Sequence, residues 1–218
     1  MKAVPRRLAV WVLAALATAA LVGSLLTALG GSGGDPPPDF GRPPAATGPA
    51  PAPPPSTETG AEAGPAGAQA APPPVRLRVP EVSLDASVVP VGVADDGTVR
   101  VPAEPRQAGW YRFGPAPGAE RGSAVLVGHV DSRTGELGAL AALYEVRPGD
   151  GVRVARDGGP ELRYTVTARA TVEKDALPAA VFRRAGPPVL TLVTCAPPYD
   201  PERGGYQRNL VVTAEPAG

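Results

Sequence analysis

The 218-residue sequence has very few of the side chains that most often carry chemistry, with one cysteine (Cys195) and one histidine (His129). A single cysteine excludes an internal disulfide, and with a single histidine it excludes a zinc site built from several Cys or His ligands. Acidic and basic residues are equal in number, 21 each, so the chain lacks the net positive charge of a general nucleic-acid binder. The solitary cysteine and histidine are therefore the first candidates for chemistry.

Glycine and proline are abundant instead, and the 27 Gly and 30 Pro make up about a quarter of the chain. That proportion is near the level of disordered sequence, whereas a hydrophobic content of 43% is compatible with a packed core. The two values agree only if the chain is divided into segments of different composition. Three segments are distinguished, at residues 1–29, 30–74 and 75–218.

Residues 1–29 contain three charges, all basic and all before residue 8, and residues 8–29 form an uncharged run of 22 residues. As a helix this run would be about 33 Å long, enough to cross the hydrocarbon core of a bilayer. Because the basic residues precede it, we expect the N-terminus in the cytoplasm and the rest of the chain outside. A cleaved signal peptide is the alternative, with Ala28-Leu29-Gly30 as its small-x-small site, but the apolar part of a signal peptide is usually shorter. Residues 1–29 therefore predict a cytoplasmic tip and a single-pass membrane anchor.

Residues 30–74 contain 14 Pro, 9 Gly and five charged residues, with no apolar periodicity. Such a stretch buries too little apolar surface to offset the entropy lost on ordering. We expect a disordered extracellular linker, partly in the polyproline II conformation, that holds a domain away from the membrane. A proline-rich ligand for another protein is the less favoured alternative.

Residues 75–218 carry 34 of the 42 charged residues and form the predicted folded domain. Their apolar residues come in short runs with β-branched side chains, separated by turn formers such as those at residues 95–97. About eight strands in this length predict an all-β domain, a closed barrel or a sandwich, with a short helix at 137–146 and a helical turn at 177–184. The expected strands are residues 75–79, 88–93, 98–101, 124–128, 151–155, 162–172, 189–194 and 209–213.

Three polar residues lie at the ends of the expected strands. His129 follows the apolar run 124–128, Cys195 follows the run 188–194, and Arg208 precedes the last strand. Taken singly, a lone cysteine is usually a buried hydrophobe, and a lone histidine or arginine is usually a surface or satisfied residue. Strand ends can meet on one rim of a barrel, where rigid backbone holds side chains that a substrate can reach. Taken together, the three residues indicate acyl transfer through a thioester.

The motifs around these residues resemble those of the sortases, cysteine transpeptidases of the Gram-positive cell surface. The family's nucleophile motif, Thr-Leu-x-Thr-Cys, stands at residues 191–195, and its Gly-His pair stands at residues 128–129. The family arginine lies on the next strand, where Arg208 follows Cys195 by 13 residues, and the 66-residue interval between His129 and Cys195 also fits. The stretches Gly-His-Val-Asp-Ser and Cys-Ala-Pro-Pro-Tyr-Asp are most similar to class F sortases of actinobacteria, a source that the high content of Ala, Gly, Pro and Arg also suggests.

The resemblance covers residues 75–218 and implies a closed eight-stranded sortase-like barrel. It implies that Cys195 attacks a backbone carbonyl in a Leu-Pro-x-Thr-Gly-like sorting signal of a surface protein and forms a thioester. His129 would donate and accept protons, Arg208 would contact the oxyanion or the peptide, and Thr194 is a weaker candidate for substrate contact. The acyl chain would pass to an amine of a peptidoglycan precursor or of a pilin lysine. We expect no cofactor, no metal and no nucleic-acid partner, and an enzyme at the cell membrane with its catalytic domain outside.

The sequence leaves several alternatives open. Arg203, in the loop 200–205, replaces Arg208 if the loop register differs. Asp131 could complete a Cys-His-Asp triad, but it lies two residues beyond His129, about 6.6 Å along an extended strand, and we expect it to shape the loop instead.

The rival function is a non-catalytic anchored β-domain that binds a surface peptide or wall polymer, and the Cys-His-Arg set counts against it. Other wall cysteine enzymes fit less well, because the Ser-His-Gly-Cys context of L,D-transpeptidases is absent and papain-like hydrolases place Cys before His.

Overall fold

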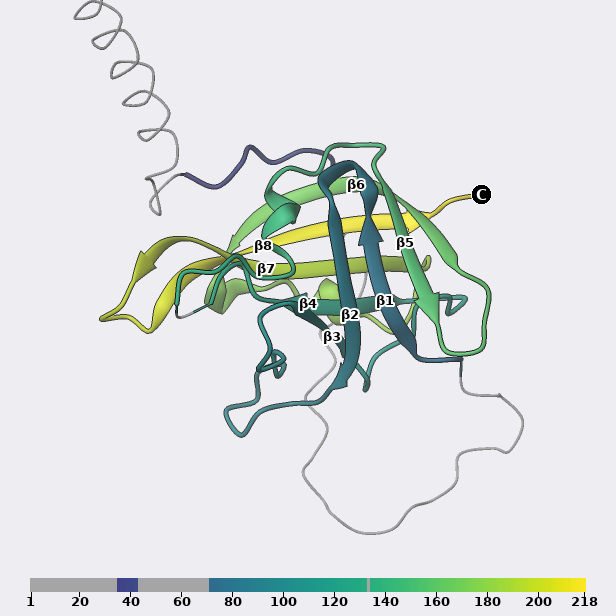
Figure 1. Cartoon of the computed structure of the whole chain (residues 1–218), viewed down its shortest axis with the longest axis horizontal. Coiled ribbons are helices and arrows are strands. Elements are labelled where there is room, and N and C mark those ends of the chain that lie inside the picture. The colour runs from purple at the N-terminus through teal and green to yellow at the C-terminus, as the bar shows by residue number, and fades with distance from the viewer. Residues whose placement is uncertain (1–34, 43–70, 133) are drawn as a thin grey trace, which may run out of the picture. The chain divides into compact units, whose positions relative to one another are not determined.

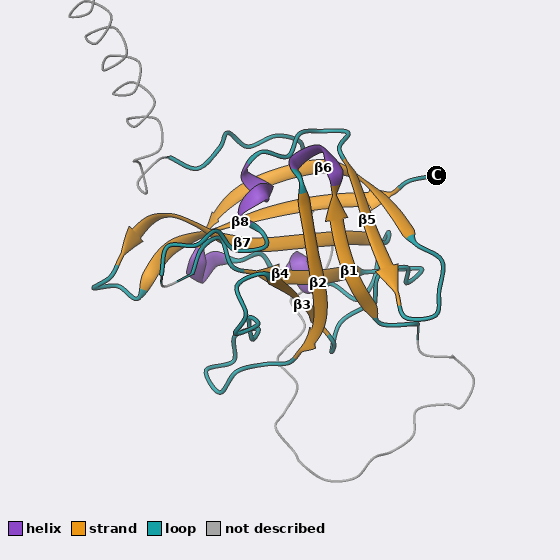
Figure 2. Ribbon diagram, viewed as in Figure 1, coloured by secondary structure: helices purple, strands orange, loops and turns teal. Residues whose placement is uncertain are grey.

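Eight strands close into a barrel in the computed structural model, which describes residues 35–42, 71–132 and 134–218. Around the barrel the strands follow the order β1-β2-β3-β4-β7-β8-β6-β5 (Figures 1 and 2), which confirms the predicted all-β closed barrel. The pairs β2–β3 and β4–β7 are parallel, and the other neighbouring pairs are antiparallel. The strands are β1 (Pro74–Val79), β2 (Leu84–Val91), β3 (Gln107–Tyr111), β4 (Ser123–Gly128), β5 (Gly151–Arg156), β6 (Leu162–Glu173), β7 (Val189–Asp200) and β8 (Gly205–Pro216).

Four short 3-10 helices connect these strands within the described residues: η1 (Pro80–Val82), η2 (Ala141–Tyr144), η3 (Lys174–Ala176) and η4 (Ala179–Phe182). η2 lies inside the helix predicted at 137–146, and η4 lies inside the turn predicted at 177–184. The predicted helix starts late because residues 138–140 pair with the chain that follows β4: the amide of Gly138 donates to the carbonyl of Val130, and that of Leu140 to the carbonyl of His129.

The barrel interior is filled by side chains that alternate along the strands, as in β2, where buried and exposed residues take turns from Leu84 to Val88. β4 and most of β7 are buried on both faces instead. Their inner side chains belong to the main core, whereas Val127 and Val193 belong to a second cluster on the outer face. The connection between β6 and β7 covers this outer face and contributes Val181 to the second cluster. Burial on both faces explains why both strands appear as continuous apolar runs in the sequence.

One predicted strand is wrong and one real strand was missed. Residues 98–101 form no strand, and Val99 makes an isolated bridge with Val93. The strand that the sequence did not predict is β3, at Gln107–Tyr111. Its sequence, Gln-Ala-Gly-Trp-Tyr, contains no β-branched residue and has a glycine in its centre. The structure shows why the glycine is there: a Cβ on Gly109 would lie 2.8 Å from Cγ1 of Val91 on the paired strand β2. Tight packing overrides strand propensity at this position.

The hairpin of β7 and β8 is longer than the sequence predicts and extends beyond the body of the barrel (Figure 1). Strand β7 continues to Asp200 and β8 starts at Gly205. Cys195 therefore lies within β7, and Arg208 lies within β8, rather than at the ends of these strands. The β7–β8 ladder continues through the pairs Cys195–Asn209 and Ala196–Arg208, so hydrogen-bonded backbone holds the two residues in place.

Part of the predicted linker contacts the barrel. Phe40 forms an isolated antiparallel bridge with Arg169 of β6, and the compact unit that contains the barrel begins at Asp35. The expectation of a disordered linker over 30–74 therefore does not hold for residues 35–42. The predicted anchor at 1–29 lies outside the described residues, and none of the helices that the structure does describe is long and apolar enough to span a bilayer.

Replacing Gly109 with alanine is expected to destabilise the fold by about 1–3 kcal/mol, because the added methyl group overpacks against Val91. Gly151→Ala in β5 is the matched control, since a Cβ there would meet only the Glu81 carboxylate, at 3.4 Å. Urea unfolding followed by circular dichroism measures both changes. Equal stability of the two variants would contradict the proposed need for glycine in β3.

Candidate active site

His129 and Cys195 are brought together by the parallel pairing of β4 with β7. Val127 stands opposite Val193 in this pairing, and both side chains lie in the outer cluster. Two residues further along each chain come His129 and Cys195. Because side chains in extended backbone return to the same face every second residue, both should face outwards at the same end of the two strands. Both residues are partly buried, so they are held by packing and remain within reach of solvent.

The two chains that carry these residues are tied together by Thr194, just beyond the last pair of the β4–β7 ladder. Its hydroxyl donates a 2.9 Å hydrogen bond to the carbonyl of Gly128, the residue before His129. Thr194 is only 2% exposed, so its hydroxyl is engaged inside the protein and the substrate contact expected for it finds no support in this position. Gly128 is itself confined, because a Cβ there would lie 2.7 Å from Cγ of Leu140 in the core. The Gly-His and Thr-Cys pairs are thus two halves of one packing arrangement.

Arg208 lies on β8, the next strand after β7 in the barrel. In the β7–β8 register Arg208 pairs with Ala196, and Asn209 stands directly opposite Cys195. The guanidinium of Arg208 forms a 2.8 Å ion pair with Glu173 on β6. The structure therefore places Arg208 one residue along from the partner of Cys195, with its charge engaged by Glu173. The sequence had not singled out Asn209 or Glu173, since both positions follow from strand register alone.

Arg203, the alternative to Arg208, lies in the turn that joins β7 and β8. Its backbone amide donates to the carbonyl of Asp200, and its side chain is exposed at the tip of the projecting hairpin (Figure 1). A strand residue next to the Cys195 pair is held more firmly than a residue in this turn. The position favours Arg208 as the functional arginine.

His129 and Asp131 have separate hydrogen-bond partners. The Nε2 atom of His129 lies 2.9 Å from the carbonyl oxygen of Pro102, which only accepts, so Nε2 carries the proton and Nδ1 is left as the base of a neutral ring. The Asp131 carboxylate accepts a 2.6 Å bond from the hydroxyl of Tyr206 on β8. It also pairs through its backbone with Leu137. These contacts attach Asp131 to the loop and the hairpin rather than to the histidine ring.

The thiol of Cys195 loses its proton less readily than a thiol in water, because burial disfavours the charged thiolate and raises the pKa. The positive charge of Lys174, at the start of η3, lowers the pKa of Cys195, and the negative charge of Asp131 raises it. Burial and the same carboxylate also raise the pKa of the Tyr206 hydroxyl. A nucleophilic role for Cys195 therefore requires a base that takes its proton at the moment of attack.

Tyr144 in η2 also contacts the cysteine, a contact that no sequence motif indicates. Its hydroxyl donates a 2.9 Å hydrogen bond to the backbone carbonyl of Cys195. Burial, together with the nearby Cys195 and Asp131, raises the pKa of Tyr144 to about 12, so the hydroxyl remains a donor at neutral pH. No spacing rule connects two residues that lie 51 positions apart in different kinds of element.

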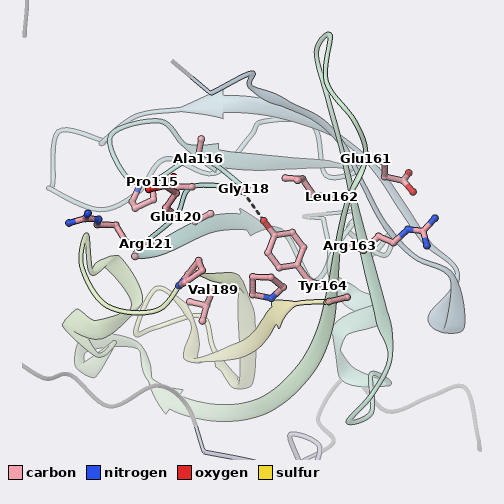
Figure 3. A pocket seen from close by; sticks show the side chains of 16 residues that line it. Pro115, Ala116, Gly118, Glu120, Arg121, Glu161, Leu162, Arg163, Tyr164 and Val189 are labelled. Atoms are coloured by element: carbon pink, nitrogen blue, oxygen red, sulfur yellow. Dashed lines mark hydrogen bonds between the residues drawn. The ribbon is translucent and has the colours of Figure 1, made fainter. Parts of the chain in front are cut away.

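A cavity of about 500 Å³ lies elsewhere in the molecule, where β4 and β7 begin (Figure 3). The hydroxyl of Tyr164 accepts a 2.8 Å bond from the amide of Gly118 at its wall. Neither Cys195 nor His129 lines this cavity, because Cys195 lies six residues into β7 and His129 lies beyond the far end of β4. Within residues 35–42, 71–132 and 134–218 there is no cluster of three or more His, Cys, Asp or Glu side chains suited to a metal ion.

The family model of the sortase domain matches residues 77–217, which run from the second half of β1 to the end of β8. The chain belongs to the sortase family. No curated protein matches it. The match spans His129, Cys195 and Arg208, and it confirms the family that the motifs at 128–129 and 191–195 suggested.

Solved sortase structures share the fold. Sortase C2 of pilus island 1 from group B Streptococcus is 21% identical, with 66% of this chain and 73% of that chain covered and a TM-score of 0.51. Sortase C-1 from Actinomyces oris is 22% identical, with 66% and 72% covered and a TM-score of 0.51. Sortase C from Streptococcus pneumoniae is 19% identical, with 66% and 68% covered and a TM-score of 0.50.

In this sortase, Asp131→Asn is expected to move the pH midpoint of Cys195 alkylation to lower pH. The substitution keeps an oxygen to accept the Tyr206 hydroxyl but removes the negative charge that raises the pKa of Cys195. Lys174→Met removes a positive charge and should move the midpoint to higher pH. Iodoacetamide labelling rates between pH 6 and about 10, the range around a thiol pKa, measure both. Shifts in the same direction for the two variants would contradict this account of the electrostatics.

Proposed function

We propose that this sortase is a membrane-anchored transpeptidase that cleaves a Leu-Pro-x-Thr-Gly-like sorting signal through a thioester on Cys195. The observation that carries the proposal is the pairing of β4 with β7, which sets His129 and Cys195 at neighbouring positions on one face. A nucleophile and a proton-transfer group on adjacent strands are the minimum that acyl transfer through a thioester needs. The third group, Arg208, stands on the next strand.

The reaction begins with proton transfer from the Cys195 thiol, for which Nδ1 of His129 is the available base. The sulfur attacks the threonine carbonyl carbon of the sorting signal, a C–S bond forms, and the carbonyl oxygen takes the negative charge. Collapse of this intermediate breaks the C–N bond to glycine, and His129 gives its proton to the departing amine. An incoming amine then attacks the thioester, transfers a proton to His129 and expels the Cys195 thiolate.

Arg208 is the proposed donor to the oxyanion or to the bound peptide. A guanidinium offers several N–H groups in a fixed plane and keeps its charge at all working pH values. In the free protein that charge is engaged by Glu173 in an exposed ion pair, which is weak enough to be exchanged for a substrate oxygen. The arginine is therefore held close to the hairpin without being locked there.

The proposed substrates are surface proteins that carry the sorting signal, and the proposed acceptors are amines of a peptidoglycan precursor or of a pilin lysine. The charge-poor, apolar run at 8–29 supports an anchor that places the catalytic domain outside the cell membrane. The motifs at 128–132 and 195–200 support assignment to class F. Partly buried apolar side chains that pack on the outer cluster, such as Leu177 and Phe182, support an apolar side chain, such as the leucine of the signal, as part of what is recognised.

The full chain in detergent should exchange the glycine side of Leu-Pro-x-Thr-Gly peptides for a free amine, and Cys195→Ala should abolish the exchange. Mass spectrometry of the peptides and of the protein detects the exchanged product and the thioester. His129→Ala is expected to lower the rate by about 10²–10⁴-fold, the usual contribution of a general acid–base group. Absence of product over a library of varied sorting motifs, with Cys195 still open to alkylation, would count against transpeptidation and favour the peptide-binding domain.

Arg208→Ala is expected to lower the exchange rate by about 10²–10³-fold, the cost of losing one oxyanion donor. Arg203→Ala is the matched control, because it removes the same side chain from the exposed turn of the same hairpin and should leave the rate unchanged. Steady-state rates at saturating peptide compare the two variants. The opposite ranking would assign the role to Arg203.

A further inference from the structure

Residues 35–42, here called the strap, cover a free edge of β6. Strand β5 pairs only with residues 162–165 of β6, so the second half of that strand lacks a β5 partner. Phe40 supplies one: its amide donates to the carbonyl of Arg169, and its carbonyl accepts from the amide of Arg169, both at 2.9 Å. A carboxylate oxygen of Asp39 accepts from the amide of Thr171 at 2.8 Å. The strap therefore satisfies β6 as an added edge strand does.

The strap sequence suits this place. Gly41 has φ +68°, and a Cβ on it would overlap the carbonyl oxygen of Thr167, so glycine alone fits there. The ring of Phe40 lies under the guanidinium of Arg169, 4.8 Å from ring centroid to Cζ. The two contacts depend on Gly41 and Phe40 themselves and not on the general Pro/Gly-rich composition of residues 30–74.

Arg169 links the strap to η2. The residue is only 6% exposed, and its guanidinium reaches two different segments of chain. Nη2 donates to the carbonyl of Pro38 in the strap at 2.9 Å, and Nη1 donates to the carbonyls of Tyr144 and Val146 at 2.8 and 2.9 Å. A buried cation is costly unless hydrogen bonds and a nearby opposite charge compensate it, and Asp39 of the strap supplies that charge.

Tyr144 is in turn held at both ends. Its carbonyl accepts from Arg169, and its side-chain hydroxyl donates to the carbonyl of Cys195 at 2.9 Å. A continuous chain of contacts thus runs from Phe40 through Arg169 and Tyr144 to the backbone of the cysteine. None of these residues touches the reacting atoms in the proposed mechanism.

We propose that the strap is part of the catalytic unit, and that Phe40, Arg169 and Tyr144 are positioning residues that hold the main chain of Cys195. The inference rests on the proposed function in taking Cys195 as the nucleophile. Loosening the strap weakens the hold of Arg169 on Tyr144, and the Cys195 carbonyl then loses its fixed donor. A small displacement of a nucleophile lowers the rate of the chemical step more than it lowers peptide binding.

The test compares Phe40→Ala, Tyr144→Phe and the double variant in the full chain, purified in detergent. Each single variant should lower kcat for peptide exchange by about 5–30-fold with KM changed by less than about twofold. Tyr144→Phe removes the hydrogen bond to the Cys195 carbonyl, and Phe40→Ala removes the ring that packs on Arg169 and so loosens the group that holds Tyr144. The double variant should be no worse than the poorer single variant, because both act through the same chain of contacts. Multiplied effects in the double variant would overturn the proposal.

Tyr164→Phe is the matched control, since it removes another buried tyrosine hydroxyl that bonds backbone, at the far cavity. It should lower the melting temperature and leave kcat unchanged. If Phe40→Ala and Tyr144→Phe behave like Tyr164→Phe, with reduced melting temperature and normal kcat, the strap is only structural and the proposal is wrong.

The rate of Cys195 alkylation at fixed pH separates this proposal from the proposed function. If the unaltered chain shows no exchange with any peptide, the proposed function fails, but alkylation still reports on the position of the thiol. A change in alkylation rate in Phe40→Ala and Tyr144→Phe, absent in Tyr164→Phe, supports the positioning role. Equal alkylation rates in all variants overturn it.

Discussion

The parallel pairing of β4 with β7 is the constraint on which the rest of the site depends. The strands are more than 60 residues apart in sequence, and their pairing sets Val127 opposite Val193 and brings His129 to the side of Cys195. The bond from Thr194 to the Gly128 carbonyl holds the two chains together where the regular ladder ends. Because both strands are also buried on both faces, a shift of either would disturb the barrel core and the outer cluster together. The relative placement of histidine and cysteine is therefore a property of the barrel and not of a loop.

The surroundings of Cys195 balance access against charge. Burial and Asp131 both raise the pKa of the thiol, and Lys174 opposes them only in part, since the net direction is upward. A resting thiolate is thus disfavoured, which protects a partly exposed cysteine from adventitious oxidation. The same burial means that a base must take the thiol proton if Cys195 is to react, and the Nε2 bond to Pro102 leaves Nδ1 as the nitrogen of His129 that can accept a proton. Arg208 is not among the charges that shift the pKa of Cys195, and its guanidinium is paired with Glu173.

The sequence predicted the barrel, the family and the order of the three candidate residues, because each depends on local signals. Apolar runs mark β4 and β7, and the short motifs at 128–129 and 191–195 lie at the ends of these runs. The sequence-based prediction failed where tertiary packing decides the structure. Gly109 permits the strand β3, which local propensity does not favour. Residues 98–101 have the composition of a strand but form a single isolated bridge. The prediction also did not find Asn209, Glu173 or Tyr144. These positions follow from register and from contacts between segments up to 51 residues apart, which no motif encodes.

The strap shows why composition misplaced the domain boundary. A Pro-rich segment has little conformational entropy to lose, because each proline already restricts the backbone, so a few specific contacts suffice to order it. Residues 36–38 are three consecutive prolines that deliver Asp39, Phe40 and Gly41 to the edge of β6. Arg169 supplies the specific contacts, and without the Pro38 carbonyl, the Phe40 ring and the Asp39 charge it would be a poorly compensated buried cation. The same guanidinium donates to the carbonyls of Tyr144 at the end of η2 and of Val146 just after it, so the compensation of this buried charge also fixes the segment that carries Tyr144. A catalytic unit cut at residue 75 would keep every motif of the family and lose the group that compensates this buried charge.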